Sequence, residues 1–235
     1  MRTRTLALAA ASGAALLATA ALPATASTAT RPADAPTRTD EDRVSAADLL
    51  AKVTSCSQIS RGKYRTDRET SATVPVCGKN GAVFWKADLD IDCDGQTTAA
   101  CNPGTDPWFR GETAFRQSDG RPLNAEKLPY VVVPASSSIW NYASAGMGGG
   151  GLVAVIYRDK VEYAVVGDTG PSRIIGEASY ATAKALGMNP DPVSGGAESG
   201  VTYILFRNSR VEPIESHSAA VSLGDELARR FIAAN

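Results

Sequence analysis

The 235-residue sequence contains only one histidine and four cysteines, which restricts the metal chemistry open to it. The cysteines lack the CxxC spacing typical of zinc sites, and His217 is distant from them in sequence. We therefore expect neither a metal site nor a cofactor. The chain also lacks an excess of basic residues, with 24 Lys and Arg against 25 Asp and Glu. This balance argues against a nucleic-acid-binding surface.

Long apolar runs are missing except at the N-terminus, where residues 6–22 are almost wholly apolar and follow Arg2 and Arg4. Small residues at 24–26 then provide the pattern that signal peptidases cleave. The adjacent arginine pair of a twin-arginine signal is absent. We predict that residues 1–26 are a cleaved signal peptide and that the mature protein is secreted, without membrane attachment.

The segment after the predicted signal peptide, residues 27–43, is rich in Thr, Ala, Pro and Asp. It lacks the apolar residues that offset ordering entropy, so we predict a disordered linker. Residues 44–235 have the length of one ordinary domain and are predicted to be a single catalytic domain. No later run is long enough to cross a bilayer.

An even number of cysteines in an exported chain indicates disulfides. Four cysteines allow three connectivities. The shortest loops are closed by Cys56 with Cys77 and by Cys93 with Cys101, and we favour this pairing.

Several short runs rich in β-branched residues predict strands. They occupy residues 82–92, 130–134, 152–157, 161–166 and 201–206. Fewer segments predict helices, namely residues 46–53, 179–186 and the amphipathic run 218–234. Many short strands with few helices predict a mainly β fold, a barrel or sandwich with short helices and a C-terminal helix.

An aspartate run occupies the end of the first long predicted strand. In a strand, residues two apart share a face, so Asp88, Asp90, Asp92 and Asp94 are expected to project together. Their repulsion requires a cation, which could be a metal ion, a Lys or Arg side chain, or an amino sugar. The run opens like an EF-hand loop, but the twelfth position is Cys101 rather than a carboxylate. A solvated acidic turn is the simpler alternative.

A second acidic segment follows the strand predicted at 161–166. Asp168 ends that strand, and Glu177 lies just before the predicted helix at 179–186. Carboxylates at both ends of a compact loop can face one cleft, which is the pair that glycosidic cleavage needs. Taken alone, each residue is more simply explained as structural: Asp168 as a turn residue, and Glu177 as a first-turn residue that interacts with the helix dipole.

Several motifs in order resemble the glycoside hydrolase family 75 chitosanases. The motifs are residues 85–95, Cys101, Asp106 with Pro107, 130–134, 167–170 and 176–179. The resemblance implies a secreted endo-acting enzyme that hydrolyses β-1,4 bonds of chitosan with inversion. It implies that the essential acids are Asp168 and Glu177.

A strand that ends in Gly-Asp-Thr-Gly, followed by an acid and a short helix, is also similar to the double-psi β-barrels of expansins, family 45 cellulases and membrane-bound lytic transglycosylases. This resemblance implies a double-psi β-barrel-like core. It also implies that Glu177 is the general acid, which leaves Asp168 as the general base.

The substrate implied is chitosan, whose ammonium groups the aspartates of residues 88–94 would neutralise. Trp85, Trp140 and Tyr142 are candidates for stacking on sugar rings or, alternatively, for the core. Thr169 is a candidate for positioning water. We expect a monomer.

Two alternatives remain from the sequence. The first is a peptidoglycan-cleaving lytic transglycosylase or muramidase that uses one acid of the same barrel. The second is a non-catalytic module, either expansin-like or a calcium-dependent binder of polysaccharide, which would explain the aspartate run. Release of reducing ends from chitosan separates these readings.

Overall fold

The computed structural model describes residues 43–235. The predicted signal peptide and residues 27–42 of the predicted linker lie outside the described residues. The described strands are β1 (Ser57–Gln58), β2 (Cys77–Lys79), β3 (Ala82–Asp92), β4 (Tyr130–Pro134), β5 (Leu152–Tyr157), β6 (Lys160–Gly170), β7 (Glu177–Ser179) and β8 (Ala197–Phe206). The helices are α1 (Ala46–Lys52), α2 (Tyr180–Ala185), α3 (His217–Ala234) and a short 3₁₀ helix, η2 (Ala143–Ala145).

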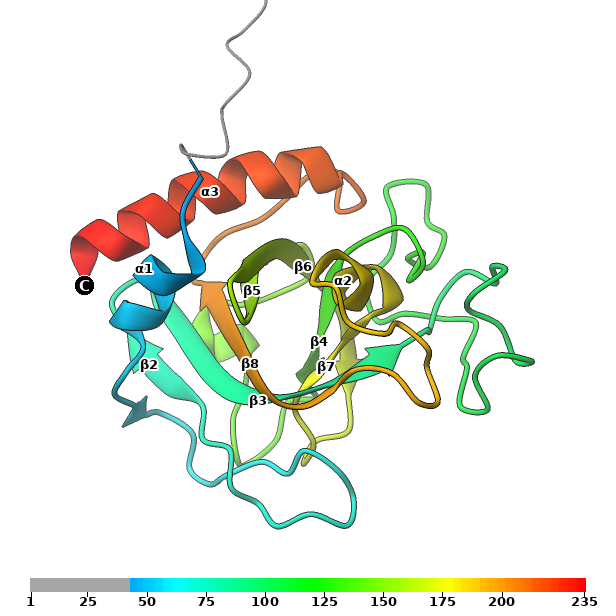
Figure 1. Ribbon diagram of the computed structural model, residues 1–235, viewed down its shortest axis with the longest axis horizontal. Helices are drawn as coiled ribbons and strands as arrows, with labels where there is room; N and C mark the ends of the chain where they lie inside the picture. Colours follow the sequence, from blue (N-terminus) through cyan, green and yellow to red (C-terminus); the bar gives the residue numbers. More distant parts are fainter. Residues whose placement is uncertain (1–42) are drawn as a thin grey trace, which may run out of the picture. The chain divides into compact units, whose positions relative to one another are not determined.

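Six of the strands close into a barrel in the order β3-β7-β4-β6-β5-β8, and β8 pairs back with β3 (Figure 1). The pairs β3–β7 and β4–β6 are parallel, and the other pairs of the barrel are antiparallel. Strands β1 and β2 extend the sheet beside the first half of β3. The predicted mainly β barrel with short helices and a C-terminal helix is confirmed, and a double-psi barrel is consistent with these pairings.

The barrel interior is apolar because one set of alternating strand residues points inward. We call this set, with the loop residues that close the ends, the inner core. Trp85 of β3 is fully buried there and stacks on Tyr203 of β8, with ring centroids 5.5 Å apart. The core includes Val131 and Val133 of β4 and Val166 of β6. No acidic side chain of the site described below points into this interior.

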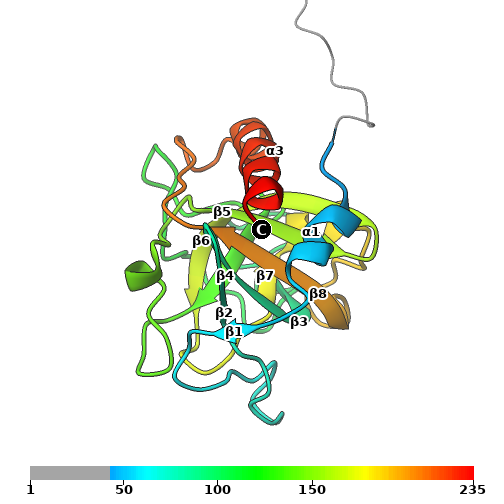
Figure 2. The ribbon, with the colours of Figure 1, turned by 90° about the vertical axis from the view of Figure 1, so that its left-hand side faces the viewer.

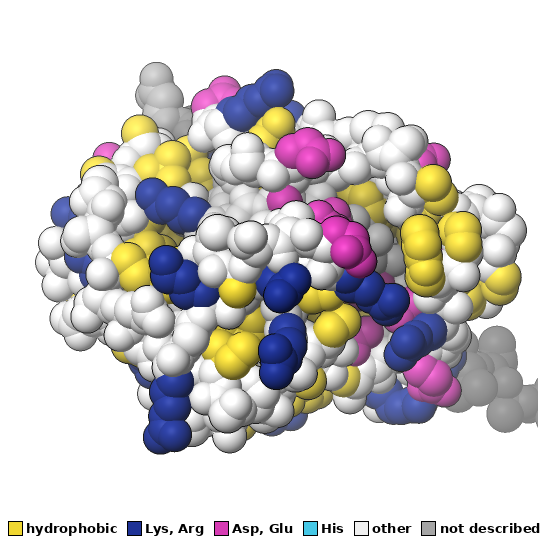
Figure 3. Space-filling model, turned by 90° about the horizontal axis from the view of Figure 1, so that it is seen from below, with side chains coloured by type: hydrophobic (Ala, Val, Ile, Leu, Met, Phe, Trp, Pro, Cys, Tyr) yellow, Lys and Arg dark blue, Asp and Glu magenta, His cyan; other side chains and the backbone are white. Residues whose placement is uncertain are grey.

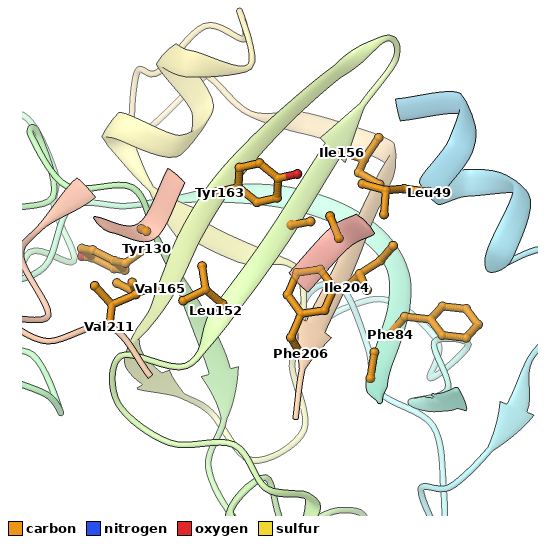
Figure 4. Packing of buried hydrophobic residues seen from close by; sticks show 14 of the residues in the cluster. Leu49, Phe84, Tyr130, Leu152, Ile156, Tyr163, Val165, Ile204, Phe206 and Val211 are labelled. Atoms are coloured by element: carbon orange, nitrogen blue, oxygen red, sulfur yellow. The ribbon is translucent and has the colours of Figure 1, made fainter. Parts of the chain in front are cut away.

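The opposite set of strand residues forms an outer core beneath α1 and α3. Leu49 of α1 meets Ile156 of β5 there, and Phe206 packs edge-on against Phe231 of α3 (Figure 4). Helix α3 lies across β5 and β6, with α1 beside it (Figure 2). Among residues 43–235, no helix combines the length and apolarity needed to span a membrane. Helices α1 and α3 cover one part of the outer surface, whereas loops surround the ends of β3 and β6.

The helix predicted at 179–186 is present as α2, but Glu177 does not lie in its first turn. Ser179 caps α2 by accepting a hydrogen bond from the N–H of Thr182. Glu177–Ser179, however, is strand β7 rather than an approach to the first helical turn. These residues pair with β3 on one side and β4 on the other. Pairing on both sides satisfies their backbone groups in an extended conformation, so tertiary structure overrides the local helix signal.

The structure contains the disulfides Cys56–Cys77 and Cys93–Cys101, in agreement with the shortest-loop pairing. The first links the segment after α1 to β2. The second closes a loop directly after β3, which is the end of the strand that carries the aspartate run.

Candidate active site

The strand register places Asp168 and Glu177 on the same outer face of the barrel. Glu177 of β7 pairs with Asp90 of β3 and with Val132 of β4. Val132 also pairs with Asp168 of β6. Because paired residues point to the same side of a sheet, all three acids face outward. Asp168 and Glu177 are two strands apart, so their Cα atoms lie about 9–10 Å from each other.

A β-bulge at Gly167 turns Asp168 outward. The β4–β6 pairing shifts between Val131–Val166 and Val132–Asp168, which leaves Gly167 as the extra residue. Val166 points into the barrel, so Asp168 would follow it inward if the strand were regular. A Cβ atom at Gly167 would lie 2.6 Å from Tyr130, so glycine is required where the bulge packs. The glycine therefore lets the bulge turn the Asp168 carboxyl group toward the outer face.

The side chain of Glu177 reaches across Val132 toward β6. Its Oε2 atom lies 3.0 Å from the position that a Cβ atom would occupy at Gly170. Gly170 is two residues beyond Asp168 on the same strand and the same face. The Glu177 carboxyl group therefore lies over β4, on the side of Asp168, and the missing side chain at Gly170 leaves room for it.

Asp168 is buried, and one of its oxygens is held by backbone. Its Oδ1 atom accepts hydrogen bonds from the N–H of Ala114 at 2.8 Å and of Thr169 at 2.6 Å. Burial raises the pKa of Asp168, whereas these two N–H groups and Arg110 lower it. Both donors bind the same oxygen, so neither uses Oδ2. The pKa of Asp168 is raised overall, because burial outweighs these contacts. The two hydrogen bonds orient the carboxyl group and leave its other oxygen for a ligand or water.

Glu177 is also buried, but its neighbours are acids rather than backbone N–H groups. Burial, followed by repulsion from Asp90, Asp94, Asp168 and Asp106, raises its pKa from 4.5 to about 7. A carboxyl group with this pKa keeps its proton in mildly acidic solution. The two acids of the face therefore differ in their contacts: backbone N–H groups partly offset the burial of Asp168, whereas neighbouring carboxylates add to the effect of burial on Glu177.

Two further aspartates lie next to this pair. Asp92 is buried, and its Oδ1 accepts a hydrogen bond from the N–H of Asp94 at 2.6 Å. Burial, and then repulsion from Glu177 and Asp94, holds the pKa of Asp92 well above its usual range. Asp94 lies beyond the end of β3 and accepts a hydrogen bond from the N–H of Arg110. Burial raises the pKa of Asp94 to about 6.

Asp88 lies farther from the pair, beside a second group of acids. Only 5 % of Asp88 is accessible, and its Oδ1 atom has no hydrogen-bond partner among residues 43–235. Burial, followed by repulsion from Asp90, raises its pKa to about 8. Asp67 and Glu198 add to this repulsion. Gly176 faces the Asp88 carboxyl group, and a Cβ atom there would clash with it. The aspartate run thus spans two connected acidic regions rather than one.

The predicted stacking aromatics lie elsewhere. Trp85 is fully buried in the inner core, and Trp140, 6 % accessible, packs edge-on against it. These two rings are core, which is the alternative that the sequence allowed. Tyr142 is partly buried against the same core, at the start of η2. Thr169 pairs with Val133, whose side chain points inward, so Thr169 contributes its N–H rather than its hydroxyl group to the site.

Three contributors to the site were missed in the sequence, namely Asp106, Arg110 and Ala114. Arg110 and Ala114 act through backbone N–H groups, which leave no side-chain signal. Asp106 falls in a motif of the family resemblance, but nothing in its local pattern distinguished it from a turn residue. All three belong to the loop that follows the Cys93–Cys101 disulfide.

The molecular surface agrees with an acidic region on one side. Seen from below, most Asp and Glu atoms gather in the right-hand half, whereas Lys and Arg are spread more widely (Figure 3). In the view of Figure 1, this is the side on which the loop after β3 lies. Among the described residues, no group of three or more His, Cys, Asp or Glu side chains is arranged to hold a metal ion.

A β-barrel whose outer face carries one carboxyl group with a pKa of about 7 and a second carboxyl group held by backbone amides has the equipment of a glycoside hydrolase. The family model described as "Fungal chitosanase of glycosyl hydrolase group 75" matches residues 89–231. The chain therefore belongs to glycosyl hydrolase group 75.

Relatives with curated descriptions carry the same name. Endo-chitosanase B of Aspergillus oryzae is 28 % identical over 179 residues, covering 68 % of this chain and 74 % of the relative. Endo-chitosanase of Aspergillus fumigatus is 30 % identical over 173 residues, covering 67 % of this chain and 73 % of the relative.

Proposed function

We propose that the protein is a secreted endo-chitosanase that hydrolyses the β-1,4 bonds of chitosan with inversion, using Asp168 and Glu177. The observation that carries this proposal is the register that sets both carboxyl groups on one outer face, on either side of Val132. The family and the names of its curated members support chitosan as the substrate.

Glu177 is the general acid in this proposal. Its pKa of about 7 keeps it protonated in mildly acidic solution, where the amines of glucosamine are also protonated. It donates that proton to the leaving glycosidic oxygen. Its position over β4 leaves the carboxyl group on the outer face of the barrel, outside the packed interior.

Asp168 is the general base. Two N–H groups fix its Oδ1 atom and stabilise the anion, and Oδ2 is the oxygen available to take a proton from water. The water then attacks the anomeric carbon from the face opposite the leaving group. Inverting enzymes separate their carboxyl groups by roughly 6.5–9.5 Å to hold this water. A backbone separation of about 9–10 Å between the two residues supports such a spacing.

The surrounding acids explain a preference for a cationic chain. Asp90 and Asp94 flank the pair, and both repel the ionised form of Glu177. Ammonium groups of chitosan would offset this repulsion, whereas a neutral N-acetylated chain would not. The proposed specificity thus arises from the same charges that raise the pKa of the acid.

We also retain the proposed organisation of the chain: signal peptide at 1–26, linker at 27–43, and one catalytic domain at 44–235 that acts as a monomer. Two disulfides favour an oxidising, extracellular compartment. The N-terminal sequence of protein recovered from culture medium tests the cleavage site. A mass twice that of one chain in light scattering would refute the monomer.

The test of function is release of reducing ends from soluble, highly deacetylated chitosan. Glu177→Gln and Asp168→Asn are each expected to lower kcat by about 10²–10⁴-fold. Matched controls on exposed sites, Glu226→Gln and Asp159→Asn, are expected to keep full activity. NMR of the first products should show the α-anomer.

Three results would count against the proposal in different ways. No reducing ends from the wild-type protein would refute chitosan hydrolysis. A β-anomeric first product would refute inversion. If Asp168→Asn kept most of the activity while Glu177→Gln lost it, a single-acid mechanism of the lytic transglycosylase kind would replace the pair.

A further inference from the structure

Trp108 is the most exposed large hydrophobic side chain in residues 43–235, with 74 % of it accessible. The other two tryptophans of the chain are core: Trp85 is 0 % and Trp140 is 6 % accessible. A side chain of this size gains little from folding when it stays in water. Tryptophan is enriched at binding interfaces, so an accessible indole close to a candidate site is a candidate contact.

The backbone that carries Trp108 is fixed on both sides. Asp106, only 6 % accessible, accepts a hydrogen bond through Oδ1 from the N–H of Trp108 at 2.8 Å. Phe109 is partly buried against the outer core. Arg110 donates its N–H to the Asp94 carboxylate at 2.6 Å. The indole thus extends into solvent from a rigid support, which lowers the entropy lost when a ligand binds it.

This support is joined to the acidic outer face that carries Asp168 and Glu177. Asp94, which binds the N–H of Arg110, is one of the acids that repel Glu177, and so is Asp106. Trp108 is two residues from Arg110, so its Cα lies within about 10 Å of the Asp94 carboxyl group.

We propose that Trp108 is a specificity-determining residue whose indole stacks on a glucosamine ring bound on the Asp94 side of the catalytic pair. A sugar ring offers an apolar C–H face to an aromatic ring, and an ammonium group is attracted to the π face. Asp94 is only partly buried, so it can supply a negative charge to that ammonium group. The inference rests on the proposed function, because it adds a subsite beside the same catalytic pair.

Fluorescence tests the contact directly. In the Glu177→Gln protein, which is expected to bind without cleaving, Trp108 is the one strongly accessible indole. A glucosamine hexasaccharide should shift its emission to shorter wavelength and protect it from iodide quenching. Both changes should vanish when Trp108→Phe is added. Unchanged emission and quenching at saturating hexasaccharide would overturn the inference.

Kinetics tests the consequence. Trp108→Ala is expected to raise KM for polymeric chitosan about tenfold, with kcat within about twofold, because stacking is lost equally from the bound and transition states. Trp108→Phe should restore most of the affinity, and the melting temperature should not change. The matched control is Tyr157→Ala, a partly exposed aromatic at the end of β5 that pairs with Lys160 at the start of β6, about 25 Å along β6 from Asp168.

The two proposals fail separately. If the wild-type protein cleaves chitosan but Trp108→Ala and Tyr157→Ala have the same KM, only the subsite is refuted. If the wild-type protein releases no reducing ends, the proposed function fails. The fluorescence titration then still decides whether Trp108 contacts the hexasaccharide.

Discussion

The Glu177 carboxyl group makes the folded protein less stable as the pH rises. Its pKa is about 7 in the folded state against 4.5 for an unperturbed glutamate, because of burial and then repulsion by neighbouring aspartates. The folded state therefore binds more protons than the unfolded state between these values, so stability is lost as the pH increases from about 4.5 to 7. Replacing Glu177 with Gln removes the charge and should stabilise the fold at alkaline pH.

The size of the effect follows from the two pKa values. Each pH unit between 4.5 and 7 contributes about 1.4 kcal/mol, which gives about 3 kcal/mol above pH 8 and about 1 kcal/mol at pH 5. The advantage of Glu177→Gln should therefore grow by about 2 kcal/mol between pH 5 and pH 8.5. For a domain of this length, that corresponds to a difference in Tm of about 4–8 °C.

The assay is urea or thermal unfolding of both proteins at pH 5 and pH 8.5. Glu226→Gln serves as the control, since this exposed residue of α3 pairs only with Arg230 one helical turn away. Its effect should stay below about 0.5 kcal/mol at either pH. If Glu177→Gln is no more stable than the wild type at pH 8.5, the glutamate is not strained by its neighbours, and the assignment of Glu177 as the proton-retaining acid loses its physical basis.

Three other outcomes are expected. The pH profile of kcat/KM should fall above about pH 7, as the acid Glu177 loses its proton. Gly170→Ala should lower kcat about tenfold without a large change in Tm, because the new Cβ would lie 3.0 Å from the Glu177 carboxyl group and from Val132. Removing the Cys93–Cys101 disulfide with a double serine variant should lower stability by about 2–3 kcal/mol, measured by urea unfolding, because it frees a loop with a sequence separation of 8.

Much of the barrel could be predicted from local sequence. The long strand β3 has the predicted bounds, because its apolar start and its alternating aspartates both have the period of a strand. The strand β7 could not be found in this way. It has only three residues, and it is a strand because β3 and β4 lie on either side of it. Its identity therefore depends on pairings that are distant in sequence.

The outward direction of Asp168 is a second feature that the sequence does not reveal. Counting residues from Val166, which points inward, places Asp168 inward as well. Only the register against β4 shows that Gly167 is an inserted residue of a bulge. A glycine in a strand is compatible with a bulge, but it does not say which partner strand accommodates it.

The sequence also does not reveal which aromatic residues are exposed. Trp85 precedes the aspartate run and Trp108 follows Asp106, so the sequence alone does not distinguish a core tryptophan from an exposed one. The inward position of Trp85 follows from its parity with Val83 and Leu89, which becomes meaningful only when the barrel closes. Trp108 is exposed because its neighbours Asp106 and Phe109 are anchored instead.

The acidic outer face links the charge of the substrate to the protonation of its carboxyl groups. Asp88, Glu177 and Asp90 have pKa values of about 8, 7 and 6. In mildly acidic solution without substrate, these carboxyl groups are therefore more protonated than isolated ones would be. An ammonium group that binds beside these carboxyl groups favours their ionised forms, so binding a cationic chain and releasing protons are coupled. Glu177 must nevertheless keep its proton to act as the acid. Its burial provides for this, because burial is the largest cause of its raised pKa and persists when the neighbouring charges are neutralised.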